Sequence, residues 1–181
     1  MLKLFITDFS AYNQGHLIGE WVTLPLDPQD LENRVEKILE LGSSVCSSNL
    51  YHDESFIADF EWDNIELFCF DEHSCIYELN EKLSLIIEKD FSEDQLRSIA
   101  FLLANRLVKD FDEAIEKLDN VIIHANSSME EIAYDFINEC YDLDSIPTVL
   151  SNHIDYEAIG RDLEIEGSFF KEDNNIFEYR D

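Results

Sequence analysis

The chain has 181 residues, of which 45% are hydrophobic and 12% aromatic, and this apolar content excludes a disordered acidic tail. Asp and Glu number 41 against 12 Lys and Arg, so the formal net charge is −29, which argues against nucleic acid as a direct partner because its phosphates would be repelled. The acidic residues recur along the whole chain, and duplex DNA carries a similar charge over about 50 Å of its axis.

A small antiparallel sheet is predicted at the start of the chain. Residues 2–8 and 16–24 have β-type patterns, and the segment 12–15 between them (Tyr-Asn-Gln-Gly) is typical of a turn, since Asn and Gly tolerate positive φ. Residues 55–62 alternate strictly between two faces. One predicted face holds Phe56, Ala58, Phe60 and Trp62, and the other holds Ile57, Asp59 and Glu61.

A helix over residues 28–41 is predicted between these strands. Asp27 has the position of its N-cap, Pro28 that of its first residue, and Gly42 that of its C-cap. The residues that share its apolar face are Leu31, Val35 and Ile38. Residues 1–74 are therefore expected to form one unit, a small antiparallel sheet plus one helix.

Residues 75–118 have no β-type pattern and are predicted to form a helical bundle. A capping-box pattern, Ser92 followed by Gln95, opens its middle helix. The core face of that helix is predicted to be Leu96, Ile99, Ala100, Leu103 and Leu107. Apolar residues at helical spacing on either side of it are Leu79, Leu83, Ile86, Ile87, Phe111, Ala114, Ile115 and Leu118.

Residues 119–181 return to an α+β pattern. A second capping box, Ser128 with Glu131, opens a helix whose apolar face is predicted to be Ile132, Ala133, Phe136, Ile137 and Cys140. Another helix is predicted over 146–159, with Pro147 near its start. Strands are predicted at 121–124, 167–171 and 175–179, the last two around a turn at Asp173-Asn174-Asn175. The whole chain is thus expected to be α+β, with three small units in an elongated row.

Rows of carboxylates lie opposite the apolar faces of several predicted helices. Acids at i and i+4 stand about 6 Å apart along a helix, of the order of the phosphate spacing along DNA. The rows are Glu32, Glu36 and Glu40; Glu131, Asp135 and Glu139; and Asp112, Glu116 and Asp119. Any acidic amphipathic helix shows one such row, and a generic acidic protein kept soluble by self-repulsion is the alternative. Several rows together favour an anionic binding surface.

No pattern typical of a catalytic, cofactor or metal site occurs in the sequence, and none of these is expected. Segments 52–54 (His-Asp-Glu) and 71–73 (Asp-Glu-His) are interpreted as solvated surface turns rather than metal sites. Asp59 and Glu61 share a strand face, but abundant acids make a chance pair a better interpretation than an acid and a base. His16 and His124 are expected to be hydrogen-bonded strand residues. The cysteines, expected to be reduced and buried, are Cys46, Cys69, Cys75 and Cys140.

Three segments resemble signatures of the ArdA antirestriction family. Residues 12–21 (YNQGHLIGEW) are similar to its YNxGxLxGxW signature, residues 56–61 (FIADFE) to a central strand, and residues 154–163 (IDYEAIGRDL) to its IDYxAxGRDLxxxG segment. The signature positions are Tyr12, Asn13, Gly15, Gly19, Trp21, Asp59, Asp155, Tyr156, Gly160, Arg161, Asp162 and Gly167. These are interpreted as structural: glycines 15 and 19 for a turn and close packing, tryptophan 21 in the core, glycine 160 as a helix C-cap, and arginine 161 paired with a carboxylate.

The resemblance implies an elongated three-part fold that dimerises through its C-terminal part and imitates bent duplex DNA. Such a protein occupies the DNA-binding groove of type I restriction-modification enzymes, at their methyltransferase core, and blocks restriction and often modification. The alternatives are an acidic regulator of another DNA-binding partner, such as a histone-like protein or a CRISPR effector, and an enzyme with a carboxylate site. The acids expected to face the partner are Asp30, Glu32, Glu36, Glu40, Asp53, Glu54, Asp63, Glu66, Asp71, Glu72, Asp112, Glu116, Asp119, Glu130, Glu131, Asp135, Glu139 and Asp142.

Two stretches depart from the family pattern. Residues 125–128 (Ala-Asn-Ser-Ser) replace a stretch that is often acid-rich in the family, and residues 42–54 have the character of a variable loop. No signal peptide and no apolar stretch of about 20 residues occurs, so a cytoplasmic location without membrane contact is expected.

Overall fold

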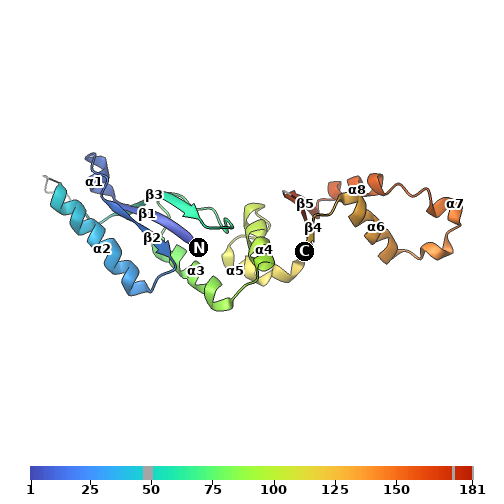
Figure 1. Ribbon diagram of the computed structural model, residues 1–181, viewed down its shortest axis with the longest axis horizontal. Helices are drawn as coiled ribbons and strands as arrows, with labels where there is room; N and C mark the ends of the chain where they lie inside the picture. Colours follow the sequence, from blue (N-terminus) through green and yellow to red (C-terminus); the bar gives the residue numbers. More distant parts are fainter. Residues whose placement is uncertain (47–50, 173, 181) are drawn as a thin grey trace. The chain divides into compact units, whose positions relative to one another are not determined.

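The computed structural model describes residues 1–46, 51–172 and 174–180 (Figure 1). Contacts divide the chain into two compact units, Met1–Leu107 and Val108–Asp181. Each unit contains a three-stranded antiparallel sheet together with helices, which confirms the α+β class. The finer division at residues 74 and 118 stays a prediction.

In the first unit, β1 (Leu2–Asp8) is the central strand of the sheet, between β2 (Gly19–Leu24) and β3 (Ser55–Trp62). Leu2, Leu4 and Ile6 alternate along β1 and are fully buried, so one face of the sheet carries the core. The antiparallel pairing of β1 with β2 confirms the predicted pair of strands.

The connection between β1 and β2 is longer and more ordered than the predicted turn. A short helix, α1 (Phe9–Asn13), follows β1 directly because the Asp8 carboxylate accepts a bond from the Ala11 amide and caps it. The turn comes after it, at Gly15, whose φ is +84°. His16 lies in the exposed stretch before β2, so the expectation that it is a strand residue was wrong.

A β-bulge in β3 overturns the predicted alternation of that strand. Phe5 pairs with Asp59 while the next residue, Ile6, pairs with Ile57, so Ala58 has no partner in the ladder. The extra residue rotates the start of the strand. As a result Ile57 shares the face of Phe60 and Trp62, and Phe56 shares the face of Asp59 and Glu61.

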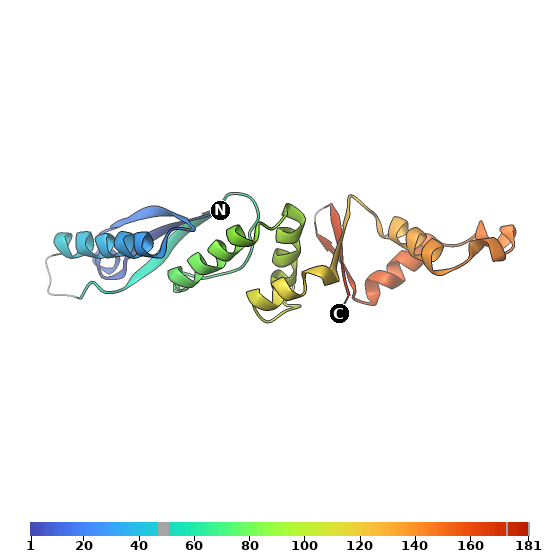
Figure 2. The ribbon, with the colours of Figure 1, turned by 90° about the horizontal axis from the view of Figure 1, so that it is seen from below.

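The long helix of the first unit is α2 (Pro28–Val45), which packs against β1 (Figure 2). The predicted cap is confirmed, because the Asp27 carboxylate accepts bonds from the amides of Gln29 and Asp30. The predicted apolar face is confirmed too, since Leu31, Val35 and Ile38 are buried. Gly42 is not the C-cap: the helix continues to Val45 and this glycine is buried in its interior.

Two further helices complete the first unit. A pair of hydrogen bonds joins α3 (Ile76–Lys89) to the chain before α2, because the Asn80 side-chain amide accepts from the Leu26 N–H and donates to the Leu26 carbonyl. The predicted capping box of Ser92 and Gln95 is confirmed at the start of α4 (Glu93–Ala104). Its core face is rotated from the predicted one: the buried residues are Ser98, Ile99, Phe101 and Leu102.

The second unit begins with α5 (Phe111–Glu116), followed by a single turn of 3-10 helix, η1 (Leu118–Asn120). In its sheet, β6 (Asn175–Tyr179) lies between β4 (Val121–Ala125) and β5 (Phe169–Glu172). Antiparallel pairing of β5 with β6 confirms the predicted hairpin. Residue 173 of the predicted turn lies outside the described residues.

Two packed helices, α6 (Met129–Cys140) and α8 (Tyr156–Ile165), form the core of the second unit with the sheet (Figures 1 and 2). Gly160 permits their close approach, because a Cβ there would lie 2.6 Å from the Met129 carbonyl oxygen. It is therefore an interior residue of α8 and not the predicted C-cap. The buried core residues are Met129, Ile132, Ala133, Leu163 and Ile176.

The predicted helix over 146–159 was wrong. The chain instead forms a 3-10 turn, η2 (Leu143–Ser145), then a short helix, α7 (Thr148–Ser151), before α8 begins. Asp155 sets the start of α8, because its carboxylate accepts a bond from the Ala158 amide. A capping carboxylate in the middle of an apolar repeat divides one predicted helix into two.

Candidate functional site

Every acid that we expected to face a partner is solvent-exposed. In the first unit these acids are Asp30, Glu32, Glu36, Glu40, Asp53, Glu54, Asp63, Glu66, Asp71 and Glu72. In the second they are Asp112, Glu116, Asp119, Glu130, Glu131, Asp135, Glu139 and Asp142. Exposure makes these carboxylates available to a cationic partner.

We call Glu32, Glu36 and Glu40 the α2 row. Their helix buries its opposite side against the sheet, so the three carboxylates lie along its solvent side about 6 Å apart. Tyr77 of α3 lies within the field of this row: burial, followed by the charges of Glu32 and Glu36, raises the pKa of its phenol. Sequence patterns had not singled out Tyr77, because its neighbours come from a distant part of the chain.

The second row, Glu131, Asp135 and Glu139, lies on α6 and is exposed along its length. Glu131 also belongs to the predicted capping box, which is confirmed: its carboxylate accepts bonds from the Ser128 amide at 2.8 Å and hydroxyl at 3.1 Å. These bonds stabilise the charged form and lower the pKa of Glu131. The Glu131 carboxylate therefore caps α6 and is also exposed to solvent as a member of the acidic row.

The third predicted row does not lie on one helix. Asp112 and Glu116 are on α5, but that helix ends at Glu116 and Asp119 lies in η1. Lys117 forms the cap between the two segments. The regular spacing expected for Asp119 was therefore wrong, although all three acids are exposed.

Asp63 is an acid whose charge the chain itself offsets. Its carboxylate lies 3.2 Å from the Lys3 ammonium group and 3.8 Å from the N-terminal amine. Lys3 also pairs with Glu61 at 3.4 Å, and these neighbours raise the pKa of Lys3. Glu61 is therefore an ion-pair partner of Lys3 on the surface of the sheet.

The glycines of the N-terminal signature have the expected structural roles. Gly15 takes the positive φ of a turn, and a Cβ at Gly19 would lie 2.3 Å from the Ile6 carbonyl oxygen. Trp21 is not in the core: it is 48% exposed on β2 and contacts the ring of Phe5. Tyr12 is half-exposed as well and contacts the ring of Phe56.

Most of the remaining signature positions make contacts within the fold. Arg161 pairs with the Glu157 carboxylate at 3.0 Å on the surface of α8, as expected. The ring of Tyr156 packs against Tyr134 of α6, and Gly167 has a φ of +86° just after α8. Asp59 accepts a bond from the next amide along the chain. Asn13 and Asp162 are exposed.

The acid-poor stretch at residues 125–128 borders a hollow of about 660 Å³. The other side of the hollow carries acids and aromatic rings from the two packed helices. The lining residues outside the stretch are Glu130, Glu131, Tyr134, Asp135 and Tyr156. Carboxylates of α6 therefore supply negative charge beside a stretch that has none of its own.

Several sequence-based expectations about histidines and cysteines were wrong. His52 is not a solvated turn residue, because its side chain is 4% exposed and its Nδ1 lies 2.7 Å from the buried carboxylate of Asp8. The cysteines are not buried: Cys69, Cys75 and Cys140 are exposed and Cys46 is half-buried.

Two other histidines lie as expected. His73 is an exposed residue beside Glu72, and His124 bonds Glu178 across the sheet.

Within residues 1–46, 51–172 and 174–180, no group of three or more His, Cys, Asp or Glu side chains is arranged to hold a metal ion. In the same residues, every helix is too short or too polar to cross a membrane. What the described chain does present is a set of exposed carboxylates on helices and connecting segments of both units.

A family model described as antirestriction protein (ArdA) matches residues 4–178 of this chain, which is nearly its whole length. A comparison with curated protein sequences gives no match.

Proposed function

The chain belongs to the ArdA antirestriction family, an inhibitor family, and from that premise we propose that it inhibits type I restriction-modification enzymes by imitating DNA. Its exposed carboxylates take the places of phosphates in the groove where the methyltransferase core binds duplex DNA. Inhibition then needs no catalytic residue, metal or cofactor. The protein blocks restriction, and modification too, because both reactions require DNA in that groove.

The observation that carries this proposal is the exposure of carboxylate rows on helices whose opposite sides are buried. A helix fixed by its apolar face holds its carboxylates in place, so the α2 row loses little conformational freedom on binding. The net charge of −29 equals that of about 50 Å of duplex DNA. Cationic residues that evolved to bind phosphates therefore meet a similar potential.

Homodimerisation through the C-terminal unit is part of the proposal. Several large apolar side chains of this unit are exposed, and Ile165 is 81% exposed at the end of α8. A contiguous patch of exposed apolar residues is typical of a protein contact, and we propose that these side chains form one in the dimer. The others are Tyr134, Phe136, Tyr141, Val149 and Leu150. We further propose that the dimer acts in the cytoplasm, where these enzymes meet incoming DNA.

The second candidate is an acidic regulator of another DNA-binding protein, such as a histone-like protein or a CRISPR effector. It rests on the same net charge of −29, which does not by itself choose among cationic partners. Capture of type I methyltransferase and specificity subunits from a host lysate favours restriction inhibition, whereas capture of only a different DNA-binding protein favours the second candidate.

The direct test is cleavage of unmodified DNA by a type I enzyme, with and without this protein, at several salt concentrations. We expect inhibition that excess duplex DNA relieves and that weakens as salt rises, because salt screens the attraction of exposed charges. Inhibition that neither DNA nor salt affects would contradict mimicry.

The α2 row gives this test a matched pair of variants. The triple change Glu32→Gln, Glu36→Gln and Glu40→Gln should weaken inhibition by about tenfold, as each exposed ion pair contributes a few tenths to 1 kcal/mol. The control changes three exposed acids of α3, Glu78→Gln, Glu81→Gln and Glu88→Gln, and has the same net charge. Equal loss in both variants would mean that total charge, and not the α2 row, determines binding.

A further inference from the structure

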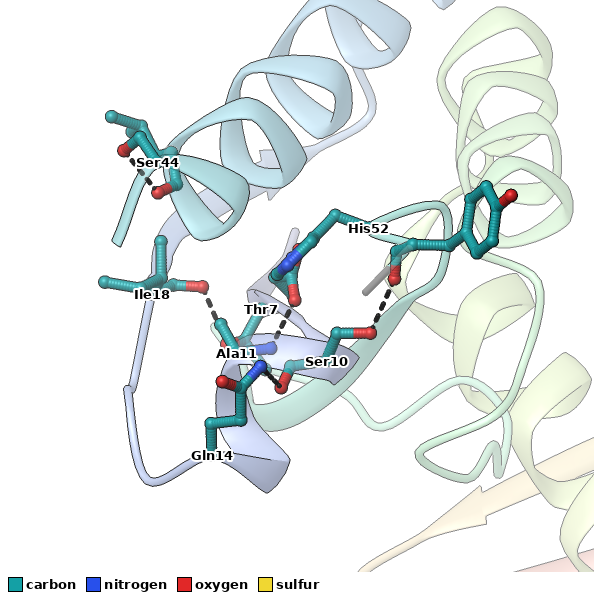
Figure 3. Close-up of polar contacts among 10 residues, drawn as sticks. Thr7, Ser10, Ala11, Gln14, Ile18, Ser44 and His52 are labelled. Carbon is teal, nitrogen blue, oxygen red and sulfur yellow. Dashed lines mark hydrogen bonds and ion pairs between the residues drawn. The ribbon is translucent and has the colours of Figure 1, made fainter. Parts of the chain in front are cut away.

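A buried carboxylate–imidazole pair joins two parts of the first unit that are 44 residues apart in sequence. Asp8, at the end of β1, is fully buried, and its Oδ2 lies 2.7 Å from Nδ1 of His52. Its other oxygen accepts a bond from the Ala11 amide at 2.6 Å (Figure 3). Both oxygens are thus bonded, as a buried carboxylate requires, since an unbonded one would be strongly destabilising.

The residues before and after His52 are also hydrogen-bonded to the start of α1, next to Asp8. The Ser10 hydroxyl donates to the Tyr51 carbonyl oxygen at 2.7 Å. Figure 3 draws this bond as the dashed line that leaves the Ser10 side chain. The Phe9 amide donates to the Glu54 carbonyl oxygen at 3.0 Å. Residues 51–54, which we call the His52 segment, are therefore joined to the junction of β1 and α1 by three bonds.

Helix α2 fixes Asp8 from a third direction. A Cβ at Gly42 would lie 2.5 Å from Oδ2 of Asp8, so the last turns of α2 pack directly on the carboxylate. The bond from the Thr7 hydroxyl to the Ile18 carbonyl oxygen, at 2.7 Å, joins the end of β1 to the residue just before β2 (Figure 3). The carboxylate to which His52 bonds is therefore held by surrounding structure and cannot follow the segment outward.

Two of the three exposed side chains that this segment carries are charged, and the third is Tyr51. Asp53 and Glu54 are both exposed, although the histidine before them is buried. Within the described residues, Nε2 of His52 has no hydrogen-bond partner, so burying the ring costs free energy that the bond to Asp8 must offset. Without that bond, the ring would gain hydration by leaving the site, and the two carboxylates would move with it.

We infer that the Asp8–His52 pair is a positioning device that holds the Asp53 and Glu54 carboxylates in one place for a cationic group of the partner. This inference rests on the proposed function, in which both acids face the restriction enzyme. Fixed carboxylates bind a cation more tightly than mobile ones, because less conformational freedom is lost on binding. His52 and Asp8 act through the segment and do not touch the partner themselves.

The experiment measures two quantities for each variant. The first is the exchange rate of the Phe9 amide hydrogen in the isolated protein, which reports whether the His52 segment is bonded to α1. The second is competition with duplex DNA for a type I methyltransferase. We expect His52→Leu to raise the exchange rate and to weaken competition by about tenfold. His52→Asn, which retains an N–H near the position of Nδ1, should restore most of both.

A double-variant comparison separates positioning from a general loss of structure. In an Asp53→Asn, Glu54→Gln background, His52→Leu should leave competition unchanged, because there are no charges left to position. His16→Leu, which changes an exposed histidine of the same unit, is the control and should alter neither quantity. If His52→Leu does not fold, Ser10→Ala releases the same segment more mildly, by removing only its bond to Tyr51.

The outcomes distinguish the two proposals. A wild-type protein that does not compete with DNA overturns the proposed function, and the positioning role with it. A wild-type protein that competes overturns the positioning role alone if His52→Leu raises Phe9 exchange without changing competition. The same conclusion follows if its effect persists undiminished in the charge-neutral background.

Discussion

The α2 row should make the protein less stable while it makes binding tighter. Glu32, Glu36 and Glu40 form two like-charged pairs at i, i+4 on the exposed side of α2. Each such pair destabilises a helix by about 0.2–0.5 kcal/mol at low salt. Changing all three to Gln should therefore raise the free energy of unfolding by about 0.4–1 kcal/mol, the sum of two pairs.

The change preserves the neutral contacts of the row. Glu32 accepts a bond from the Gln29 side chain at 2.9 Å, and a glutamine at position 32 retains an oxygen that can accept it. The apolar side of α2 is untouched, so the effect on stability isolates charge. A second readout is Tyr77: its pKa is raised by burial and then by Glu32 and Glu36, so it should fall in the variant without reaching the value of a free phenol.

The assay is thermal unfolding of wild type and triple variant at low and high salt. A gain of 1 kcal/mol corresponds to a rise in Tm of about 2–4 °C for a chain of this size. The gain should shrink at 1 M salt, where the Debye length is about 3 Å and adjacent carboxylates no longer repel. A variant that is less stable than wild type, or a gain that is independent of salt, would refute this reasoning.

Two further predictions concern packing and pH. Gly160→Ala should lower the free energy of unfolding by about 1–3 kcal/mol, measured by urea unfolding, because its Cβ would lie 2.6 Å from the Met129 carbonyl oxygen. The control is Gly167→Ala, where φ is +86° but the surroundings are open. A smaller loss in Gly160→Ala than in this control would contradict a close contact between α6 and α8. Glu131 has a lowered pKa in the folded protein, so its bonds to Ser128 stabilise the fold above the ordinary value of 4.5, and this contribution is lost as pH falls through the lowered value. Glu131→Gln retains an acceptor for Ser128 but does not titrate. The Tm of this variant should therefore fall less than that of wild type between pH 5 and pH 3, about the range in which ordinary carboxyl groups titrate. Equal falls in Tm would refute a lowered pKa of Glu131.

Local hydrogen bonding made part of this structure readable from sequence alone. Asp27 with Pro28, Ser92 with Gln95, and Ser128 with Glu131 each start a helix where the pattern predicts, because a cap and its amide partners lie within three residues of each other. Exposure of the acids was predictable for a similar reason, since a charged side chain opposite an apolar stripe has only solvent to face.

Contacts between distant segments decided the rest. Gly42 and Gly160 resemble helix ends in sequence, yet each is an interior residue of a helix. Glycine is needed at both positions because another segment packs in the space that a Cβ would occupy. The bulge at Ala58 depends on how β3 pairs with β1. His52 is followed by two acids, a pattern that predicts a surface residue. Its side chain is buried because it bonds the carboxylate of Asp8, 44 residues earlier in the chain. The sequence by itself determined where the helices with a capping motif begin and that the acids expected to face a partner meet solvent, whereas tertiary packing alone decided which small and polar residues are buried, because their partners are adjacent only after the chain has folded.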